Sequence, residues 1–455
     1  MSPTQHTERA WLFKEVKSQR ALMRAWLNVK PRVTNAKDAK TRAAAGIFAQ
    51  AADRSIRKLQ SDLRSGKFVF EPQHGILKST RPKLGKPKKE PRPIVVAPVR
   101  SRIVQRAILD TCQSDRPEVK RRLGSLPKII VTPTSVGGLP GRGVPQAIGL
   151  ISAAIANGAK WFVRSDLKKF FQTIPKPKVQ EFLRSNIADP EFVNLFMQAL
   201  ATELENEDEV RELIHLFPLG EEGVPQGSAL SALSANIVLA KFDEELNGRG
   251  MTTIRYLDDF IILGQTRNTT IKSWTSAQKI LKSLNMECHD PNAGTGKAST
   301  GTIAADVDFL SYHIDDKSIY PSKEAREKFL RDLRDTIRNA RKAISSVKDE
   351  PRRAEPRFIQ SLSLLDRKIR GWGDAFSATT MGLIFTQLDS EIDKIVEAYL
   401  HWFGRVRRGR SLKHQRRLLG IALLTDTENK TTNQPASRKS SAPTQNRRSA
   451  NGSAT

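Results

Sequence analysis

The chain has 455 residues, and its 76 Lys and Arg against 48 Asp and Glu give a formal net charge of +28 at pH 7. This length suits two or three domains, and the positive excess indicates a polyanionic partner and argues against a neutral metabolic enzyme. No apolar run approaches the roughly 20 residues that cross a bilayer, there is no apolar leader, and two cysteines cannot form a disulfide framework, so we expect a cytoplasmic protein without a membrane role.

The first part of the chain predicts helices followed by a basic, proline-rich segment. Apolar residues recur at helical spacing through residues 8–66. KFVF (67–70) is a candidate strand, and the Pro- and Lys-rich stretch 72–98 predicts a hairpin or loop with a single strand, IVV, at its end. IVQRAILDTC (103–112) predicts a further helix.

Strands and helices alternate in the middle of the chain without a strict βαβ rhythm, which indicates an α+β sheet with helices behind it. WFVRSDL (161–167) predicts a strand that passes into a helix, and a longer helical region follows over 177–213. Residues 223–247 predict a turn that enters a helix. TTIRYLDDFIILG (252–264) predicts two short strands, and VDFLSYHI (307–314) predicts one more.

The last part of the chain, from 322 to 420, is again helical in pattern and basic, and it ends in the cluster RVRRGRSLKHQRR (405–417). We expect this cluster and the basic segment 78–89 to bind an RNA backbone, because each phosphate that Lys or Arg neutralises releases counterions. The final residues contain almost no large apolar side chain, so we expect them to be disordered.

Two adjacent carboxylates, Asp258 and Asp259, lie between the strand patterns TTIRY and FIILG, where the turn of a hairpin would hold them. Neighbouring like charges repel, and Mg²⁺, which prefers carboxylate oxygens, would relieve that repulsion. The alternative is an ordinary acidic turn. Asp166 follows the strand WFVRS, and two-metal phosphoryl transfer requires carboxylates that converge from separate elements. Alone, Asp166 is more simply explained as a helix N-cap.

The segment GVPQGS (223–228) is a third candidate for chemistry. Its glycines allow the backbone to approach a ligand closely, and Gln226 is suited to hydrogen-bond a base or a sugar. The alternative is a plain loop before a helix. The glycines of GGLPGRG (137–143) suggest a phosphate loop only weakly, because the Lys-Ser/Thr ending of such loops is missing.

In this order, these segments resemble the palm motifs of reverse transcriptases, closely over about 57–320 and more loosely over 322–405. The resemblance is to bacterial enzymes of the group II intron and retron superfamily, and it implies a right-hand polymerase with fingers, a palm built on an antiparallel sheet, and a helical thumb. The palm motifs are similar to DLKKFF, GVPQGSALSALSANIVL, YLDD, NMECHDPNAGTGK and VDFLSYHI, and the finger blocks to RPIVVAPVRSRIVQRAI and SVGGLPGRGVPQAI. The implied domains are N-terminal helices and fingers (1–160), palm with finger insertions (161–320), basic thumb and C-terminal region (321–420) and tail (421–455).

The resemblance also implies roles for individual residues. Phe171 is the expected steric gate that excludes a ribose 2′-hydroxyl, although a core position is the alternative. Lys297 is the candidate acid for the departing pyrophosphate, and a solvated loop lysine is the alternative. The ligands of two Mg²⁺ ions, or of Mn²⁺, would be Asp166, Asp258, Asp259 and the backbone carbonyl of Leu167, and the substrate would contact Arg92, Gln226 and Tyr256 as well as Phe171.

The function implied is RNA-directed DNA polymerisation, with an RNA template, deoxynucleotides as substrates and cDNA as product. No CxxC pair or His-rich nuclease segment follows the thumb, and the valine-threonine-glycine signature of retron enzymes is absent. These departures favour the solitary, defence-associated enzymes, which use a cognate noncoding RNA. A homo-oligomer is one possible assembly of this chain. The alternatives are an intron enzyme that assists RNA splicing and a non-catalytic RNA-binding protein on the same scaffold.

Overall fold

The computed structural model describes residues 10–79, 90–248, 251–294, 296–346 and 357–424. It divides into two compact units, the first formed by residues up to 322 with 377–380, and the second by 323–376 with 381 onward. Helices and antiparallel sheets together confirm the predicted α+β class. None of the helices in these described ranges is long and apolar enough to cross a membrane.

The first unit opens with four helices, in agreement with the predicted helical region. Ser18 and Asp38 cap the second and third of these helices by accepting hydrogen bonds from their first-turn amides. Trp26 is buried with its ring 4.7 Å from that of Phe48, and both belong to a core that continues into the rest of this unit. The helices are α2 (Trp11–Val16), α3 (Gln19–Thr34), α4 (Ala39–Gln50) and α5 (Ala52–Arg64), and α2, α3 and α4 pack against α6 (Val99–Cys112).

The strand predictions for this region were partly wrong. Residues 67–70 form no strand, because Phe68 and Phe70 pack edge-to-face on each other and against the core instead of pairing with a neighbouring chain. Two strands, β1 (His74–Lys78) and β2 (Arg92–Val96), pair where one was expected. The strand β1 is short and contains a glycine, so it depends on pairing with β2 and on the Asn206 side chain, which bonds both backbone groups of Gly75. Residues 80–89 of the expected basic segment lie outside the described residues.

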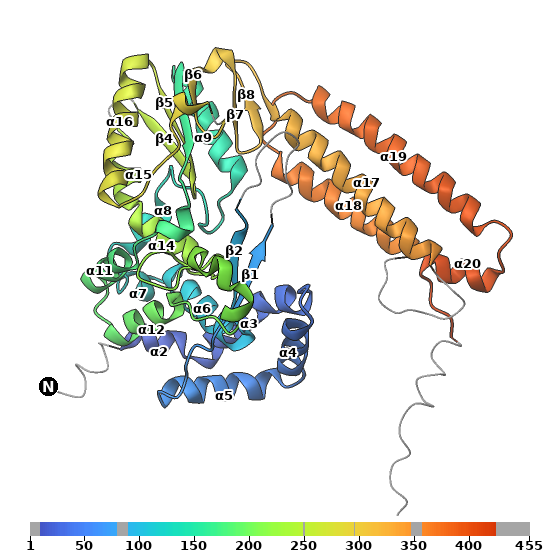
Figure 1. Ribbon diagram of the computed structural model, residues 1–455, viewed down its shortest axis with the longest axis horizontal. Coiled ribbons are helices and arrows are strands. Elements are labelled where there is room, and N and C mark those ends of the chain that lie inside the picture. Colours follow the sequence, from blue (N-terminus) through green and yellow to red (C-terminus); the bar gives the residue numbers. More distant parts are fainter. Residues whose placement is uncertain (1–9, 80–89, 249–250, 295, 347–356, 425–455) are drawn as a thin grey trace, which may run out of the picture. The chain divides into compact units, whose positions relative to one another are not determined.

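A four-stranded antiparallel sheet forms the centre of the first unit, in the order β4 (Thr252–Tyr256), β5 (Asp259–Gly264), β3 (Trp161–Asp166) and β6 (Ser299–Thr302). Strand β5 is buried almost throughout, which requires cover on both faces of the sheet. Helix α16 (Arg267–Ser283) packs against β3 and β5, α9 (Val144–Ala156) packs against β4, and Figure 1 draws these helices on opposite sides of the sheet.

The predicted long helical region over 177–213 is interrupted. Pro190 begins a new helix, because proline lacks the amide that would continue the preceding one. Asp189 caps this helix and also accepts a hydrogen bond from the Phe13 amide, so it ties α12 to α2. The first unit also contains α7 (Pro117–Lys120), α8 (Leu126–Val131), α10 (Phe170–Thr173), α11 (Lys176–Asn186), α12 (Pro190–Leu200), α13 (Glu207–Val210), α14 (Ser231–Val238) and α15 (Ala240–Glu245).

The prediction of one strand over 307–314 was also wrong. The segment forms a hairpin of β7 (Val307–Phe309) and β8 (Tyr312–Ile314), and β9 (Ile319–Pro321) pairs with β8. Leu310 and Ser311 both have positive φ, 49° and 69°. Turns of this type usually carry Asn-Gly, and Leu-Ser gives no such signal.

The second unit is helical, as the pattern over 322–420 predicts. It consists of α17 (Lys323–Ser345), α18 (Phe358–Ala375), α19 (Leu383–Arg407) and α20 (Leu412–Leu419), of which α18 and α19 both pack on α17 (Figure 1). Its core includes Phe358 stacked on Phe403 at 3.7 Å and a buried hydrogen bond between Tyr399 and Ser361. The basic cluster 405–417 spans the end of α19 and most of α20, and all but the first four residues of the expected tail lie outside the described residues.

Because the second unit has its own core, we expect Phe403→Ala to destabilise it by ~3–5 kcal/mol and to leave the four-stranded sheet protected. Hydrogen exchange in denaturant, followed separately in α19 and in β5, measures both effects. The control is Leu400→Ala on the same helix, which is 46% exposed and should change the free energy of unfolding by less than ~0.5 kcal/mol. Equal loss of protection in β5 would contradict two separate cores.

Candidate active site

Three carboxylates meet at one end of the four-stranded sheet. Asp166, the last residue of β3, is paired directly with Asp259, the first residue of β5. Directly opposed residues of an antiparallel pair have Cβ atoms ~4.5–5.5 Å apart and project to the same face. Asp258 precedes Asp259 in the turn from β4, and its carbonyl accepts a hydrogen bond of 3.1 Å from the Leu167 amide. The fold therefore brings together acids that are far apart in the sequence.

The turn that carries Asp258 is tight and closely supported. Tyr256 pairs with Asp259, so only Leu257 and Asp258 form the loop, and Leu257 has φ +58°, a region that favours glycine. A Cβ on Gly137 would lie 2.3 Å from the Leu257 amide nitrogen, so a glycine is required where this segment crosses the turn. The segment GGLPGRG is thus a support for the hairpin.

Arg142, in the same segment, is committed to backbone carbonyls. Its guanidinium donates to the carbonyls of Val131, Thr132 and Ser135, which fixes the stretch that runs beside β4. A phosphate loop would instead leave its cation and amides facing a ligand. The weak suggestion of a phosphate loop here is therefore wrong.

Two of the three carboxylates, Asp258 and Asp259, have raised pKa values. Burial raises the pKa of Asp259 to about 7, and the charges of Asp258 and Asp166 add to the rise. Burial also raises the pKa of Asp258, with a further contribution from Asp166 and opposing ones from Arg92 and Lys297. A site that disfavours negative charge in this way is suited to a cationic partner.

Two basic side chains, Lys297 and His289, lie beside Asp166, and burial lowers the pKa of His289. The Lys297 ammonium lies 2.9 Å from Asp166 Oδ2, and His289 Nε2 lies 3.7 Å from Oδ1 and 3.1 Å from the Lys297 nitrogen. Asp166 Oδ1 is nevertheless buried without a hydrogen-bond donor among the described residues. An orphaned carboxylate oxygen of this kind is an available ligand for a hard cation.

These residues fit divalent cations in their chemistry and position, with one rearrangement. Across the described ranges, no three His, Cys, Asp or Glu side chains stand ready in a metal-binding arrangement. In this structure the Lys297 ammonium pairs with Asp166. A cation that used this carboxylate oxygen would have to displace Lys297, whereas the backbone already places all three acids at adjoining positions.

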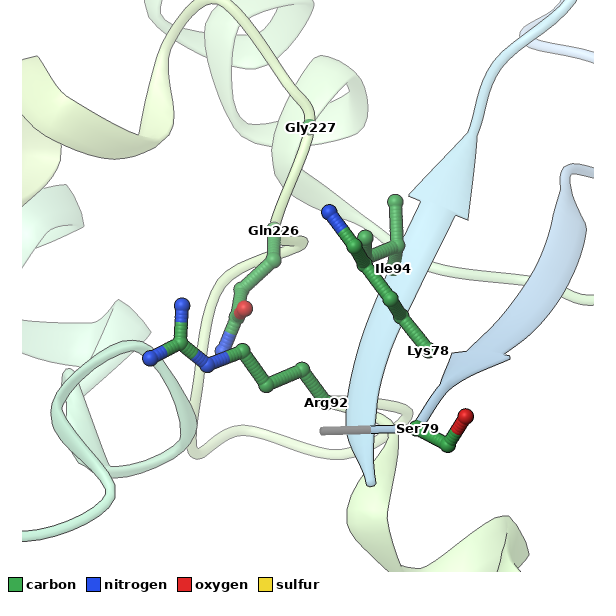
Figure 2. Close-up of a pocket in the computed structure, with 6 residues that line it drawn as sticks. All are labelled: Lys78, Ser79, Arg92, Ile94, Gln226 and Gly227. Carbon is green, nitrogen blue, oxygen red and sulfur yellow. The ribbon is translucent and has the colours of Figure 1, made fainter. Parts of the chain in front are cut away.

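A second feature of the site is a cavity of about 270 Å³ between the β1–β2 ribbon and the GVPQG loop. Figure 2 shows the Arg92 side chain extending from β2 beside the amide of Gln226. The other residues that line the cavity are Lys78, Ser79, Ile94 and Gly227. Exposed cations beside a hydrogen-bonding amide form a surface that suits a phosphorylated ligand.

Backbone contact holds the GVPQG loop against β2. The Val95 amide donates to the Gln226 carbonyl at 2.8 Å. Gly227 has φ +124°, and a Cβ there would lie 2.5 Å from the Val95 carbonyl oxygen. A glycine is therefore needed for the loop to reach this edge, which explains the second glycine of the motif.

The two phenylalanines after Asp166 have different environments. Phe170 is buried in the core, whereas Phe171 is half-buried with its ring 5.1 Å away. The Phe171 carbonyl accepts a hydrogen bond of 2.7 Å from the Val224 amide, so the candidate gate and the GVPQG loop are connected through the backbone.

Some residues of the cluster were not identified from the sequence. His289 lies in the segment NMECHDPNAGTGK, whose resemblance drew attention to Lys297 alone. Arg164, two residues before Asp166 on β3, opposes the rise in the pKa of Asp259. The alternation of side chains along a strand, which places residues i and i+2 on one face, is the signal that could have identified Arg164.

An antiparallel sheet with acids at the adjoining ends of β3 and β5, next to a basic cavity, defines the palm of a right-hand polymerase. A sequence model of the reverse transcriptase (RNA-dependent DNA polymerase) family matches residues 81–291, a range that contains the three acids, Arg92 and Gln226. Residues 81–291 therefore match the reverse transcriptase family, as the motifs predict.

The chain is similar to three curated proteins. Protein YkfC of Escherichia coli is 29% identical over 163 residues, which cover 35% of this chain and 38% of that protein. An uncharacterized 91 kDa protein in a cob intron of Schizosaccharomyces pombe is 28% identical over 189 residues, and a putative COX1/OXI3 intron 1 protein of Saccharomyces cerevisiae is 29% identical over 194; each match covers 42% of this chain. The chain thus spans 38% of the first relative's length and 20% of that of the other two.

Among solved structures, a chain of a partial Cas6-RT-Cas1–Cas2 complex is similar, with a TM-score of 0.32 and 20% sequence identity. The match covers 60% of this chain and 42% of that chain.

The raised pKa of Asp259 predicts a pH dependence for the metal-free protein. The unfolded chain releases this proton near 3.8, whereas the folded protein keeps it up to about 7, so unfolding releases a proton between these values. The free energy of unfolding should therefore fall as pH rises from about 4 to about 7. Asp259→Asn should remove this part of the slope.

Thermal unfolding in chelator from pH 4 to pH 8 measures the slope. The matched control is Asp115→Asn, whose side chain is fully exposed and should leave the slope as in the wild type. If Asp259→Asn and the wild type have the same slope, the raised pKa is refuted.

Proposed function

We propose that this chain is an RNA-directed DNA polymerase that acts in the cytoplasm and adds deoxynucleotides by two-metal nucleotidyl transfer. The observation that carries the proposal is the direct pairing of Asp166 with Asp259, with Asp258 in the adjoining turn. A protein that only binds RNA has no use for three acids that repel one another at the end of a sheet. The match of residues 81–291 to the reverse transcriptase family supports the same conclusion.

Asp166, Asp258, Asp259 and the Leu167 carbonyl would hold two Mg²⁺ ions, with Mn²⁺ as a substitute. When bound, such ions lower the pKa of the attacking 3′-hydroxyl and neutralise charge on the triphosphate and the leaving group. The protein's own contribution is to position these ligands. Pairing of β3 with β5 and the Leu167–Asp258 backbone hydrogen bond fix them before any substrate arrives.

The basic cavity beside the acids would receive the incoming deoxynucleotide. Arg92 is exposed at the start of β2 and would bind the triphosphate through two parallel hydrogen bonds. Gln226 would contact the base or sugar from the opposite wall. Tyr256, directly across from Asp259, would border the sugar.

Lys297 would act at the leaving group. Its ammonium already lies 2.9 Å from Asp166, so it is close to the position that the phosphates would occupy. A protonated amine there can donate its proton to the departing pyrophosphate. Exchange of its partner from Asp166 to the triphosphate of the incoming nucleotide would free the carboxylate for metal binding before pyrophosphate departs.

For the biological setting, we propose antiphage defence with a cognate noncoding RNA as template. This rests on the resemblance of the palm and finger motifs to the solitary, defence-associated enzymes. The second candidate is an intron enzyme that assists splicing through the basic second unit, and two relatives named for the introns that contain them favour it. Sequencing RNA that co-purifies with the protein separates the two. A short structured RNA encoded beside the gene supports defence, and intron ends flanking the gene support splicing.

The polymerase proposal predicts that Asp258→Asn/Asp259→Asn abolishes DNA synthesis. Removal of direct metal ligands should lower the rate by more than the ~100-fold that loss of a ligand's supporting hydrogen bond costs. The assay measures incorporation of labelled deoxynucleotides with Mg²⁺ on a primed RNA and on the co-purified RNA. Glu181→Gln, on the exposed face of α11, is the control and should retain full activity. Equally low incorporation by wild type and double variant would exclude catalysis.

The gate assignment predicts that Phe171→Ala increases ribonucleotide incorporation relative to deoxynucleotide incorporation. Removing a ring that excludes one hydroxyl should relax this selectivity by roughly 10–200-fold. The ratio of kcat/KM for the two nucleotide types is the measurement. Phe170→Leu, in the neighbouring core position, is the control, because it should lower stability while the ratio stays as in the wild type. An unchanged ratio in Phe171→Ala would assign that ring to the core.

A further inference from the structure

A fully buried arginine lies directly beneath the acidic turn. Arg255, on β4 just before Tyr256, has no exposed surface, and its guanidinium is paired with Asp243 of α15. We propose that Arg255 is a positioning residue that sets the geometry of the Asp258 turn, and that its buried pair with Asp243 serves this placement rather than the stability of the fold. The inference rests on the proposed function, since it concerns the same carboxylates.

The guanidinium is clamped on three sides. Its Nε and one terminal nitrogen donate to the two oxygens of Asp243, at 2.7 and 2.5 Å. That terminal nitrogen also lies 2.8 Å from Ser135 Oγ and 2.8 Å from Asn236 Oδ1. The other terminal nitrogen donates at 3.0 Å to the carbonyl of Leu257. The first three partners, Asp243, Ser135 and Asn236, orient the planar group, and the bond to the fourth partner, Leu257, transmits that orientation to the turn.

The bond to Leu257 matters because of the residue that follows. The carbonyl on one side of Asp258 accepts from Arg255, and the carbonyl on its other side accepts from the Leu167 amide at 3.1 Å. Both peptide planes around Asp258 are therefore fixed, one from inside β4 and one from the end of β3. The left-handed conformation of Leu257 costs energy by itself, so the turn needs such an external hold.

The same network fixes the segment that crosses the turn. Ser135 donates to Asn236 at 3.1 Å, and the Asn236 amide donates to the carbonyl of Gly137 at 3.1 Å. Gly137 is the residue that contacts the Leu257 amide nitrogen. Arg255 thus reaches the turn by two routes, directly through Leu257 and indirectly through the crossing segment.

The energetics favour placement over stability as the reason for this pair. A buried ion pair loses about as much free energy through desolvation as it gains through attraction, so apolar residues of similar volume often replace one without loss of stability. Arginine stays charged at any accessible pH and presents its donors in a rigid plane. Two apolar side chains would fill the same space, but the Leu257 carbonyl would lose the hydrogen bond that Arg255 donates to it.

The test uses the full chain and the double variant Arg255→Met/Asp243→Leu, which removes both charges together. We expect it to unfold near the wild-type temperature. In the metal-free protein, amides of residues 252–264 should exchange faster, and Mn²⁺ affinity, measured by paramagnetic resonance with Mn²⁺ alone, should fall ~10–100-fold. In polymerisation, kcat should fall by a similar factor, while KM for the deoxynucleotide changes little.

Two further variants make the test specific. Arg255→Lys keeps the charge beside Asp243 but cannot hold Asp243 and Leu257 in one plane, so it should fold and still lose Mn²⁺ affinity. The control Arg106→Met/Asp110→Leu removes an ion pair on α6, outside the sheet, and should leave Mn²⁺ affinity unchanged. The proposal is overturned if the folded Arg255 and Asp243 double variant binds Mn²⁺ and exchanges like the wild type, or if it cannot fold at all.

These outcomes are separable from the fate of the proposed function. If the wild type does not polymerise, and both Arg255 variants bind Mn²⁺ more weakly than the wild type, the proposed polymerase is refuted and the positioning role is supported. If the wild type polymerises, and both Arg255 variants keep its kcat and its Mn²⁺ affinity, the proposed function is supported and the positioning role is refuted.

Discussion

The mutual repulsion of three carboxylates is the constraint on which the rest of this site depends. Asp166 and Asp259 are forced together by strand pairing, and Asp258 follows in a turn too short to move away. Partial burial limits how well water screens the repulsion, and it raises the pKa of both Asp258 and Asp259. Free energy from the packing of the sheet therefore holds a cluster that local charge repulsion opposes, and in this structure Lys297 offsets part of that charge at Asp166.

The support for this cluster lies in the backbone more than in side chains that face it. Gly137 crosses the turn at a point where any Cβ would collide with it. Gly227 allows the GVPQG loop to approach β2, and Arg255 donates a hydrogen bond to the Leu257 carbonyl in the turn. Each contact joins segments distant in the chain. A polymerase needs its metal ligands in place before the substrate binds, and rigid non-local contacts of this kind supply that preorganisation.

Elements with a strong local pattern were predicted well. Helices of the N-terminal region and of the second unit follow their apolar spacing, and the two strands around Asp258 follow theirs. The strand β1, the hairpin at Leu310 and the break at Asp189 were missed or merged. Strand β1 depends on its pairing with β2, which its own residues do not indicate. The hairpin has a turn without glycine, and the break comes from a proline inside an otherwise helical pattern.

The sequence by itself determined the class of protein, because the acids, the glycine loop and their order along the chain are properties of the residues themselves. Tertiary structure alone decided that Lys297 pairs with Asp166, that His289 lies beside it, and that a glycine-rich segment supports the turn. Tertiary structure also places Arg255 against the Leu257 carbonyl, whereas in the sequence it is one arginine among many in a basic protein. The physical reason is that residue chemistry is local, whereas burial and convergence arise only when distant segments pack together.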